Sequence, residues 1–322
     1  MIKESITFDA STGGGNMIAG FFCPANIRAE GGKSKGVIQI CHGMADHFSR
    51  YDEMIEYLNG RGFDVCGMDM MGHGQTYELN KGNDMPLGYF GDAKDSHLCI
   101  LKDEMTMHAR AKERFGDDVP YFLYGHSMGS FVCRNIYITP EYSKEFEAFI
   151  FASTMGPNPA AGAGLALTNM MKIFGRKRAP GKLVNKIAFG TYNRLIDKPK
   201  TDFDWVTSDE KEVEKYIADP YAGFLFTNKG FSDLFKLVIR MQKTDAYDSI
   251  PLEKPVMLTY GEDDPVGNYG VGVKDVCEIL RSKGIVVTEK NYGHYRHEIQ
   301  NESVRWDYFQ DIADFFTRTV EG

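Results

Sequence analysis

A serine between two glycines joins a strand pattern to a helix pattern, and this stretch constrains the fold more than any other. Residues 121–124 form an apolar run that predicts a buried strand, and residues 130–137 place apolar side chains on one face of a helix. Gly125-His126-Ser127-Met128-Gly129 lies between them. The glycines remove Cβ atoms where strand and helix crowd together, so Ser127 can adopt a strained turn with an exposed hydroxyl. The stretch predicts a nucleophile elbow.

Two backbone amides are candidates to bind a developing oxyanion. The first N–H groups of the helix after Ser127 point toward the place where negative charge would form on a bound carbonyl oxygen, which makes the Met128 amide one donor. The apolar run 37–41 predicts a parallel strand covered on both faces, and His42-Gly43-Met44 follows it. In folds with a nucleophile elbow such a loop supplies the second donor, which we assign to the Met44 amide. We expect His42 to hold this loop in place.

Strand and helix patterns alternate along most of the chain. Further strands are expected at 63–69, 149–152, 256–260 and 285–290, and helices at 51–58, 92–115, 271–283 and 303–317. Residues 5–9 and 18–23 predict a hairpin at the sheet edge. The alternation predicts an α/β fold with a doubly wound, mostly parallel sheet.

Residues 155–250 break this alternation, because they contain helical patterns and little strand signal. We expect them to form a helical cap inserted into a core made of residues 1–154 and 251–322. Within the cap, residues 208–217 and 232–243 predict helices that begin at serine N-caps.

The first third of the cap is basic and amphipathic. Residues 155–190 contain six lysines and arginines and no acid. An apolar stripe runs through it at helical spacing: Leu167, Met170, Met171 and Phe174. We interpret the stripe first as a helix face packed on neighbouring cap helices. The alternative is a surface for anionic or amphiphilic substrates, with transient contact to a membrane or micelle.

Composition excludes several other classes of protein. Apolar residues make up 43% and charged residues 25% of the 322 residues, which is typical of a globular protein with a sizeable core. The net charge of −8 argues against a nucleic-acid partner. The sequence shows neither a secretory signal nor a transmembrane run. The six cysteines lie far apart, mostly within expected strands or helices, as reduced thiols do, so we expect a cytoplasmic protein.

A serine nucleophile needs a base that is oriented by a carboxylate. In the fold expected here, the acid and the histidine follow the serine in that order, on loops after later strands. The acidic loop 261–266 follows the strand at 256–260, and the loop 292–299 follows the last strand. Chain order alone does not choose between Asp263 and Asp264, or between His294 and His297.

The motifs resemble the lysophospholipase and monoacylglycerol-lipase branch of the α/β hydrolases, which is grouped with the serine aminopeptidase-like (S33) hydrolases. The resemblance spans nearly the whole chain and rests on residues 42–47, 72–76, 125–129, 219–224, 261–266 and 296–299. It implies an α/β-hydrolase fold in which Asp264, just before Pro265, is the acid and His297, in Arg-His-Glu-Ile, is the base. The sequence departs from the family's pattern at Thr76, where serine is usual, and at His294, where glycine is usual.

The resemblance implies a serine hydrolase that cleaves carboxylic esters through an acyl-enzyme, with a monoacylglycerol, lysophospholipid or related acyl ester as its small-molecule substrate. Ser127, Asp264 and His297 would be catalytic, and the reaction needs no cofactor. No metal site is expected, since His297-Glu298-Ile299-Gln300-Asn301 lacks the second histidine of H-E-x-x-H and no C-x-x-C occurs. An aminopeptidase or amidase of the same family is one alternative, and a ligand-binding homologue without turnover is another.

Overall fold

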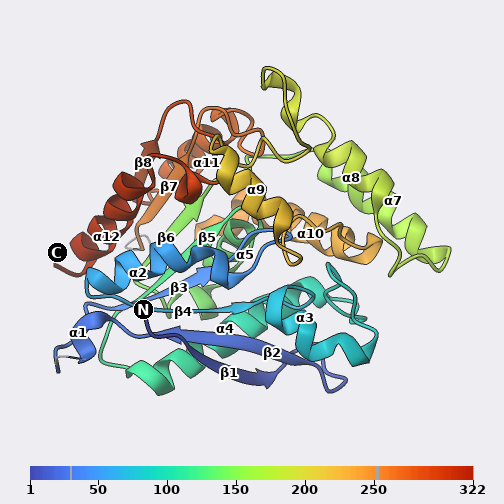
Figure 1. Cartoon of the computed structure of the whole chain (residues 1–322). Coiled ribbons are helices and arrows are strands. Elements are labelled where there is room, and N and C mark those ends of the chain that lie inside the picture. The colour runs from blue at the N-terminus through green and yellow to red at the C-terminus, as the bar shows by residue number, and fades with distance from the viewer. Residues whose placement is uncertain (30, 251–253, 322) are drawn as a thin grey trace.

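The computed structural model describes residues 1–29, 31–250 and 254–321. Figure 1 shows a central twisted sheet with helices on both faces and a helical region over one end. The sheet has eight strands in the order β1-β2-β4-β3-β5-β6-β7-β8. The strands are β1 (Glu4–Asp9), β2 (Met17–Cys23), β3 (Val37–Cys41), β4 (Asp64–Asp69), β5 (Tyr121–His126), β6 (Ala148–Ala152), β7 (Val256–Tyr260) and β8 (Val287–Asn291).

The sheet is mostly parallel, as predicted. Strand β2 pairs antiparallel with both β1 and β4, and all other neighbouring pairs are parallel. The predicted hairpin therefore forms the edge of the sheet. The fold is that of an α/β hydrolase, in which the carboxyl ends of the parallel strands meet along one edge.

Apolar side chains alternate between two cores, one on each face of the sheet. On β5, Phe122 and Tyr124 belong to the core beneath α2 (Asp52–Gly60) and α12 (Arg305–Glu321). Tyr121 and Leu123 belong to the opposite core, beneath α4 (Ser96–Phe115), α5 (Met128–Tyr137) and α11 (Val271–Ser282). This period-two alternation explains why the central strands are apolar at nearly every position.

Some element boundaries and some short helices differ from the predictions. Helix α4 begins at Ser96 rather than at residue 92, and β8 begins at Val287 rather than at Ile285. Three short helices lie where none was predicted: α1 (Asn26–Ala29), α3 (Gly74–Asn80) and α6 (Pro140–Ser143). No helix in the described ranges is long and apolar enough to cross a membrane.

Between β6 and β7 the described chain adds no strand to the sheet. It forms α7 (Ala161–Ile173), α8 (Lys182–Phe189), α9 (Glu210–Ala218) and α10 (Asn228–Met241). Helices α7 and α8 lie at the outer end of this region, away from the sheet (Figure 1). The division at residues 154 and 250 stays a prediction, and residues 251–253, which follow the second boundary, lie outside the described part.

Both predicted serine N-caps are wrong. The side chain of Asp209 caps α9 by accepting the Lys211 N–H at 3.0 Å, and Thr227 caps α10 by accepting the Gly230 N–H at 3.0 Å. Ser232 therefore lies inside α10. The Asn228 N–H, which has no acceptor within the helix, donates to the Ala179 carbonyl at 3.0 Å, so the first turn of α10 is satisfied from outside the helix as well as by Thr227.

Strand β3 and helix α5 approach each other most closely at Gly129. A Cβ atom on Gly129 would lie within 2.6 Å of the carbonyl carbon of Cys41, and one on Gly125 within 2.6 Å of the carbonyl carbon of Gly129. Real Cβ atoms do not approach backbone so closely, and backbone cannot rotate away as a side chain can. Glycine is therefore required at both positions by packing, as the sequence predicted.

We predict that Gly129→Ala lowers the free energy of unfolding by about 1–3 kcal/mol or more, because the added methyl group forces the end of β3 away from α5. Gly162→Ala is the matched control. Gly162 lies in α7 with open space around its Cβ position, so alanine should leave the stability unchanged or raise it slightly. Urea denaturation of both variants measures the difference. Equal stability of the Gly129 variant and the wild type would contradict the packing argument.

Candidate active site

Ser127 occupies a strained backbone conformation between β5 and α5. Its φ is 53° and its ψ is −121°, a region that side-chain-bearing residues rarely adopt. The Ser127 N–H donates to the Ala152 carbonyl of β6 at 3.0 Å, and its own carbonyl accepts the N–H groups of Ser130 and Phe131. These bonds fix the turn from both sides, which is how surrounding structure sustains such strain. The local geometry is that of a nucleophile elbow.

Asp264 and His297 meet at the carboxyl edge of the sheet. Asp264 lies on the loop after β7, and His297 on the loop after β8. His297 Nδ1 lies 3.0 Å from Asp264 Oδ1, which also accepts the Val266 N–H at 2.9 Å. Both residues are buried. The imidazole thus donates from Nδ1, which leaves Nε2 as its basic nitrogen.

The other two candidates form a separate pair at the surface. His294 Nδ1 lies 3.3 Å from Asp263 Oδ1, and the two side chains are 82% and 51% exposed. Neither residue lines the cavity that contains Ser127 and His297. The alternatives that chain order left open are therefore separated in space, and the family resemblance chose the buried pair.

Ser127 lines a cavity of about 880 Å³. Met44, Met128 and His297 line the same cavity, together with residues from α5, α7, α8, α9 and α10. Much of its wall is apolar: Phe131, Leu167, Val184, Phe189, Leu234 and Phe235. The site can therefore hold an extended apolar group next to a serine hydroxyl and an imidazole.

His42 fixes the peptide group that carries the Met44 amide. Its Nδ1–H donates to the Gly43 carbonyl at 2.8 Å, and its Nε2 accepts the Met70 N–H at 2.9 Å. Burial lowers the pKa of His42, in agreement with a neutral ring that donates from one nitrogen and accepts at the other. In a trans peptide the N–H points away from the carbonyl, so holding the Gly43 carbonyl also aims the Met44 N–H. This is the loop-holding role expected from the sequence.

His73 is also enclosed, and it does not line the cavity. Its Nδ1 lies 3.0 Å from the Met71 carbonyl, and its ring packs against Phe90, Phe224 and Phe226. Burial lowers the pKa of His73 well below its usual value. This histidine orders the loop.

Several residues around His297 were not singled out from the sequence. The carbonyl of His297 accepts a hydrogen bond from Ser153 Oγ at 2.7 Å and another from His126 Nε2 at 3.2 Å. The Trp205 ring lies 5.1 Å from the imidazole, on the cap side. Burial lowers the pKa of His126 to about 4, so this ring is neutral at pH 7. His126 stands inside the elbow motif, but nothing in the sequence indicates which loop it contacts.

A family model described as serine aminopeptidase, S33 (Hydrolase_4) matches residues 32–304 of the 322. The chain belongs to this family. Monoglyceride lipase of Mus musculus is 27% identical over 189 residues, which cover 59% of this chain and 53% of that protein. Monoacylglycerol lipase of Mycolicibacterium smegmatis is 23% identical over 87% of this chain and 88% of its own. The match to the mouse protein thus spans about half of its length.

Among solved structures, a thermostable carboxyl esterase from Bacillus coagulans in complex with glycerol superposes with a TM-score of 0.90. It is 28% identical, and the match covers 99% of each chain. The similarity therefore extends through the core and the cap alike.

We predict that Asp264→Asn lowers kcat about 10⁴-fold, because an amide favours the wrong imidazole tautomer, whereas Asp263→Asn has little effect. In the same way, His297→Ala should abolish turnover, and His294→Ala should retain most of it. Steady-state kinetics of the four variants on one p-nitrophenyl ester provide the comparison. An inactive His294 variant beside an active His297 variant would show that the exposed pair is the functional one.

Proposed function

We propose that this chain is a serine hydrolase that cleaves carboxylic esters through an acyl-enzyme, with monoacylglycerols, lysophospholipids or related acyl esters as substrates. The observation that carries the proposal is the arrangement of Ser127 and the Asp264–His297 pair at one apolar cavity. The relatives named monoglyceride lipase and carboxyl esterase support the same class of reaction.

In the proposed mechanism, Ser127 Oγ attacks the ester carbonyl while His297 Nε2 takes its proton. Asp264 stabilises the resulting imidazolium through Nδ1. The amides of Met44 and Met128 bind the oxyanion, each contributing about 3 kcal/mol of transition-state stabilisation. His297 then protonates the leaving alcohol, and a water molecule activated by the same imidazole releases the acid. The reaction uses only groups of this chain and water.

The charges of the cavity favour an ester over an aminopeptidase substrate. An aminopeptidase needs a free carboxylate for the substrate ammonium group. The acidic residues that line the cavity are Asp46, Asp202 and Glu298. Arg50 binds both Asp46 and Glu298, and Asp202 is exposed. Among the described residues, no enclosed carboxylate in the cavity thus awaits an ammonium partner, although the family description includes aminopeptidases.

We also infer a cytoplasmic location, on the argument from cysteine usage. All six cysteines are free and buried, which suits a reducing compartment.

We further propose that the outer end of the cap makes transient contact with micelles or membranes that contain the substrate. The predicted apolar stripe is divided in two. Leu167 and Met171 pack against the core, which agrees with the packing interpretation, whereas Phe174 is 74% exposed. Ile173 beside it is 82% exposed, and Ile187 of α8 is 65% exposed. Ile187 also lines the cavity. Large apolar side chains exposed on two neighbouring cap helices fit an amphiphile interface.

The basic residues of the segment divide in the same way. Lys177 and Arg178 pair with Asp92 of the core, so they attach the cap to its support. Lys186 is exposed beside the cavity and makes no ion pair with any described residue. Only part of the basic segment is therefore available to an anionic surface.

Replacing Ile173 and Phe174 with serine should lower the activity on micellar monoacylglycerol by at least about tenfold and leave the activity on p-nitrophenyl acetate within twofold. The reason is that a large apolar side chain leaving water contributes about 1.5–3 kcal/mol to adsorption. Val286→Ser is the control, since Val286 is 61% exposed outside the cap. An equal loss on both substrates would leave Ile173 and Phe174 without an interfacial role.

Fluorophosphonate labelling, followed by a panel of p-nitrophenyl esters and aminoacyl anilides, tests the proposed reaction. We expect labelling at Ser127, turnover of esters only, and a loss of about 10⁵–10⁶ in kcat for Ser127→Ala with the fold intact. Faster turnover of anilides would favour the aminopeptidase, and an unlabelled Ser127 would favour a ligand-binding homologue.

A further inference from the structure

Arg50 binds two carboxylates from two loops that are far apart in the sequence. It lies in the short 3-10 helix η1 (Phe48–Tyr51), directly after the loop that carries Met44. Arg50 Nη1 lies 2.8 Å from Asp46 Oδ1 and 2.8 Å from Glu298 Oε1, and Nη2 lies 2.6 Å from Glu298 Oε2. The side chains of Arg50, Asp46 and Glu298 are only 13%, 3% and 5% exposed. A planar guanidinium can hold both carboxylates at once.

Asp46 connects Arg50 to the loop of residues 42–47, which carries the Met44 amide and is called the oxyanion loop below. Its Oδ2 accepts the Gly43 N–H at 3.2 Å and the Tyr51 hydroxyl at 2.8 Å. Gly43 directly precedes Met44, so the carboxylate fixes the turn from which the Met44 amide projects. Burial alone raises the pKa of Asp46, but Arg50 and the neighbouring imidazoles outweigh it, and the pKa is lowered. Asp46 therefore stays ionised and needs its counter-ion.

Glu298 directly follows His297, so it connects Arg50 to the loop of residues 292–299, called the histidine loop below. Its N–H donates to the Val206 carbonyl at 2.7 Å, and Asn301 Nδ2 donates to its Oε2 at 2.6 Å. With its side chain held by Arg50 and its backbone by the cap, Glu298 sets the path of the chain through His297.

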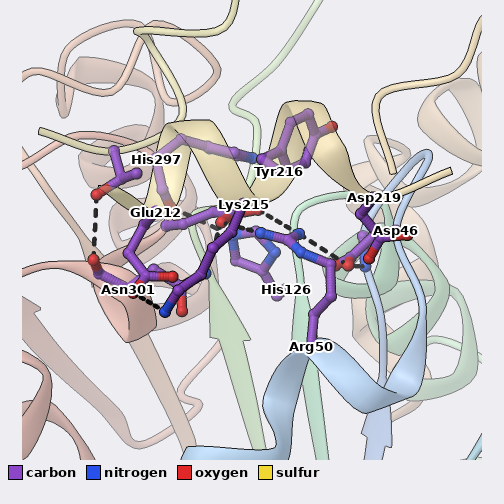
Figure 2. A network of polar contacts seen from close by, with 12 residues as sticks. Asp46, Arg50, His126, Glu212, Lys215, Tyr216, Asp219, His297 and Asn301 are labelled. Atoms are coloured by element: carbon purple, nitrogen blue, oxygen red, sulfur yellow. Dashed lines mark hydrogen bonds and ion pairs between the residues drawn. The ribbon is translucent and has the colours of Figure 1, made fainter. Parts of the chain in front are cut away.

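Helix α9 of the cap closes this arrangement. Figure 2 shows Arg50 beneath the helix that carries Tyr216, with Asp46 beside it. The Tyr216 ring lies 4.6 Å from the guanidinium and shields it from water. Next to them, His47 and Asp219 form a second link between loop and cap, at 2.7 Å. In such an enclosed place a charge that loses its partner is costly, so the three groups depend on one another.

We propose that Arg50 is a positioning residue that holds the oxyanion loop and the histidine loop in register, so that the Met44 amide and His297 face Ser127 together. The inference rests on the proposed function, because it takes the roles of Met44, Ser127 and His297 from that proposal. Arg50 itself touches no reacting atom. It acts through Asp46 on one side and Glu298 on the other.

Arg50→Met should lower kcat about 10²-fold on a p-nitrophenyl ester, the size of effect expected when reacting groups move by about 1 Å. KM should change less than about threefold, because the apolar walls of the cavity are unaffected. The rate of fluorophosphonate labelling should fall in parallel with kcat. Arg61→Met is the matched control. Arg61, directly after α2, pairs with Asp314 of α12 at 3.3 Å, and its loss should leave kcat unchanged.

Two further variants separate positioning from stability, also where Arg50→Met folds poorly. The triple variant Asp46→Asn/Arg50→Met/Glu298→Gln contains no unpaired charge at this place, so its melting temperature should recover while kcat stays low. Arg50→Lys keeps the charge but cannot bridge both carboxylates in one plane, and should lose about tenfold in kcat. Recovery of kcat together with stability in the triple variant, or wild-type kcat in Arg50→Lys, would overturn the proposal.

Fluorophosphonate labelling distinguishes a failure of this proposal from a failure of the proposed function. Failure of wild-type Ser127 to react with fluorophosphonate would contradict the proposed function. Labelling of the wild type and of Arg50→Met at equal rates would contradict the role of Arg50 alone.

Discussion

The close approach of helix α5 to the end of strand β3 is the constraint on which the site depends. Gly129 lets the helix start against the carbonyl group of Cys41, and Ser127 takes up the strain in a left-handed turn held by β6 and by the first turn of α5. Because helix, strand and turn are fixed together, the hydroxyl of Ser127 and the amide of Met128 have one position relative to the sheet. Every other group of the site has to be brought to that position.

The parallel sheet brings those groups together at one edge. The loops after β3, β5, β7 and β8 all leave from the carboxyl edge, so groups separated by more than two hundred residues meet there. The direction of each loop is then set by polar side chains in enclosed places: His42 on the Gly43 carbonyl, Ser153 and His126 on the His297 carbonyl, and Arg50 between two carboxylates. Each of these contacts is stronger for being shielded from water.

The cap contributes in two different ways. The stretch from Asp204 to Gly223 is bonded to both loops of the site, through Trp205 and Val206 to residues 297 and 298, and through Gly223 to Ala45. It is a fixed wall. Helices α7 and α8 instead carry strongly exposed apolar side chains, among them Ile173 and Ile187, and lie at the outer end of the cap (Figure 1). Under the proposed function, the stretch from Asp204 to Gly223 would position the two loops, and α7 and α8 would contact amphiphilic substrates.

The sequence by itself predicted the strand–turn–helix at Ser127, the alternation of the main strands and helices, and the three loops that carry Met44, Asp264 and His297. These predictions rest on the spacing of apolar residues and glycines within short stretches of sequence, which can be seen without knowing the tertiary structure. Local patterns did not distinguish Asp264 from Asp263, because adjacent residues differ only in the direction of their side chains. The family resemblance named Asp264 and His297, and the tertiary structure shows that they meet in the interior while Asp263 meets His294 in solvent. Only the tertiary structure decided the bond of Arg50 to Glu298, because an ion pair between residues so far apart leaves no periodicity in the sequence. Burial, which gives that pair its strength, exists only once β3, β8 and the cap have come together.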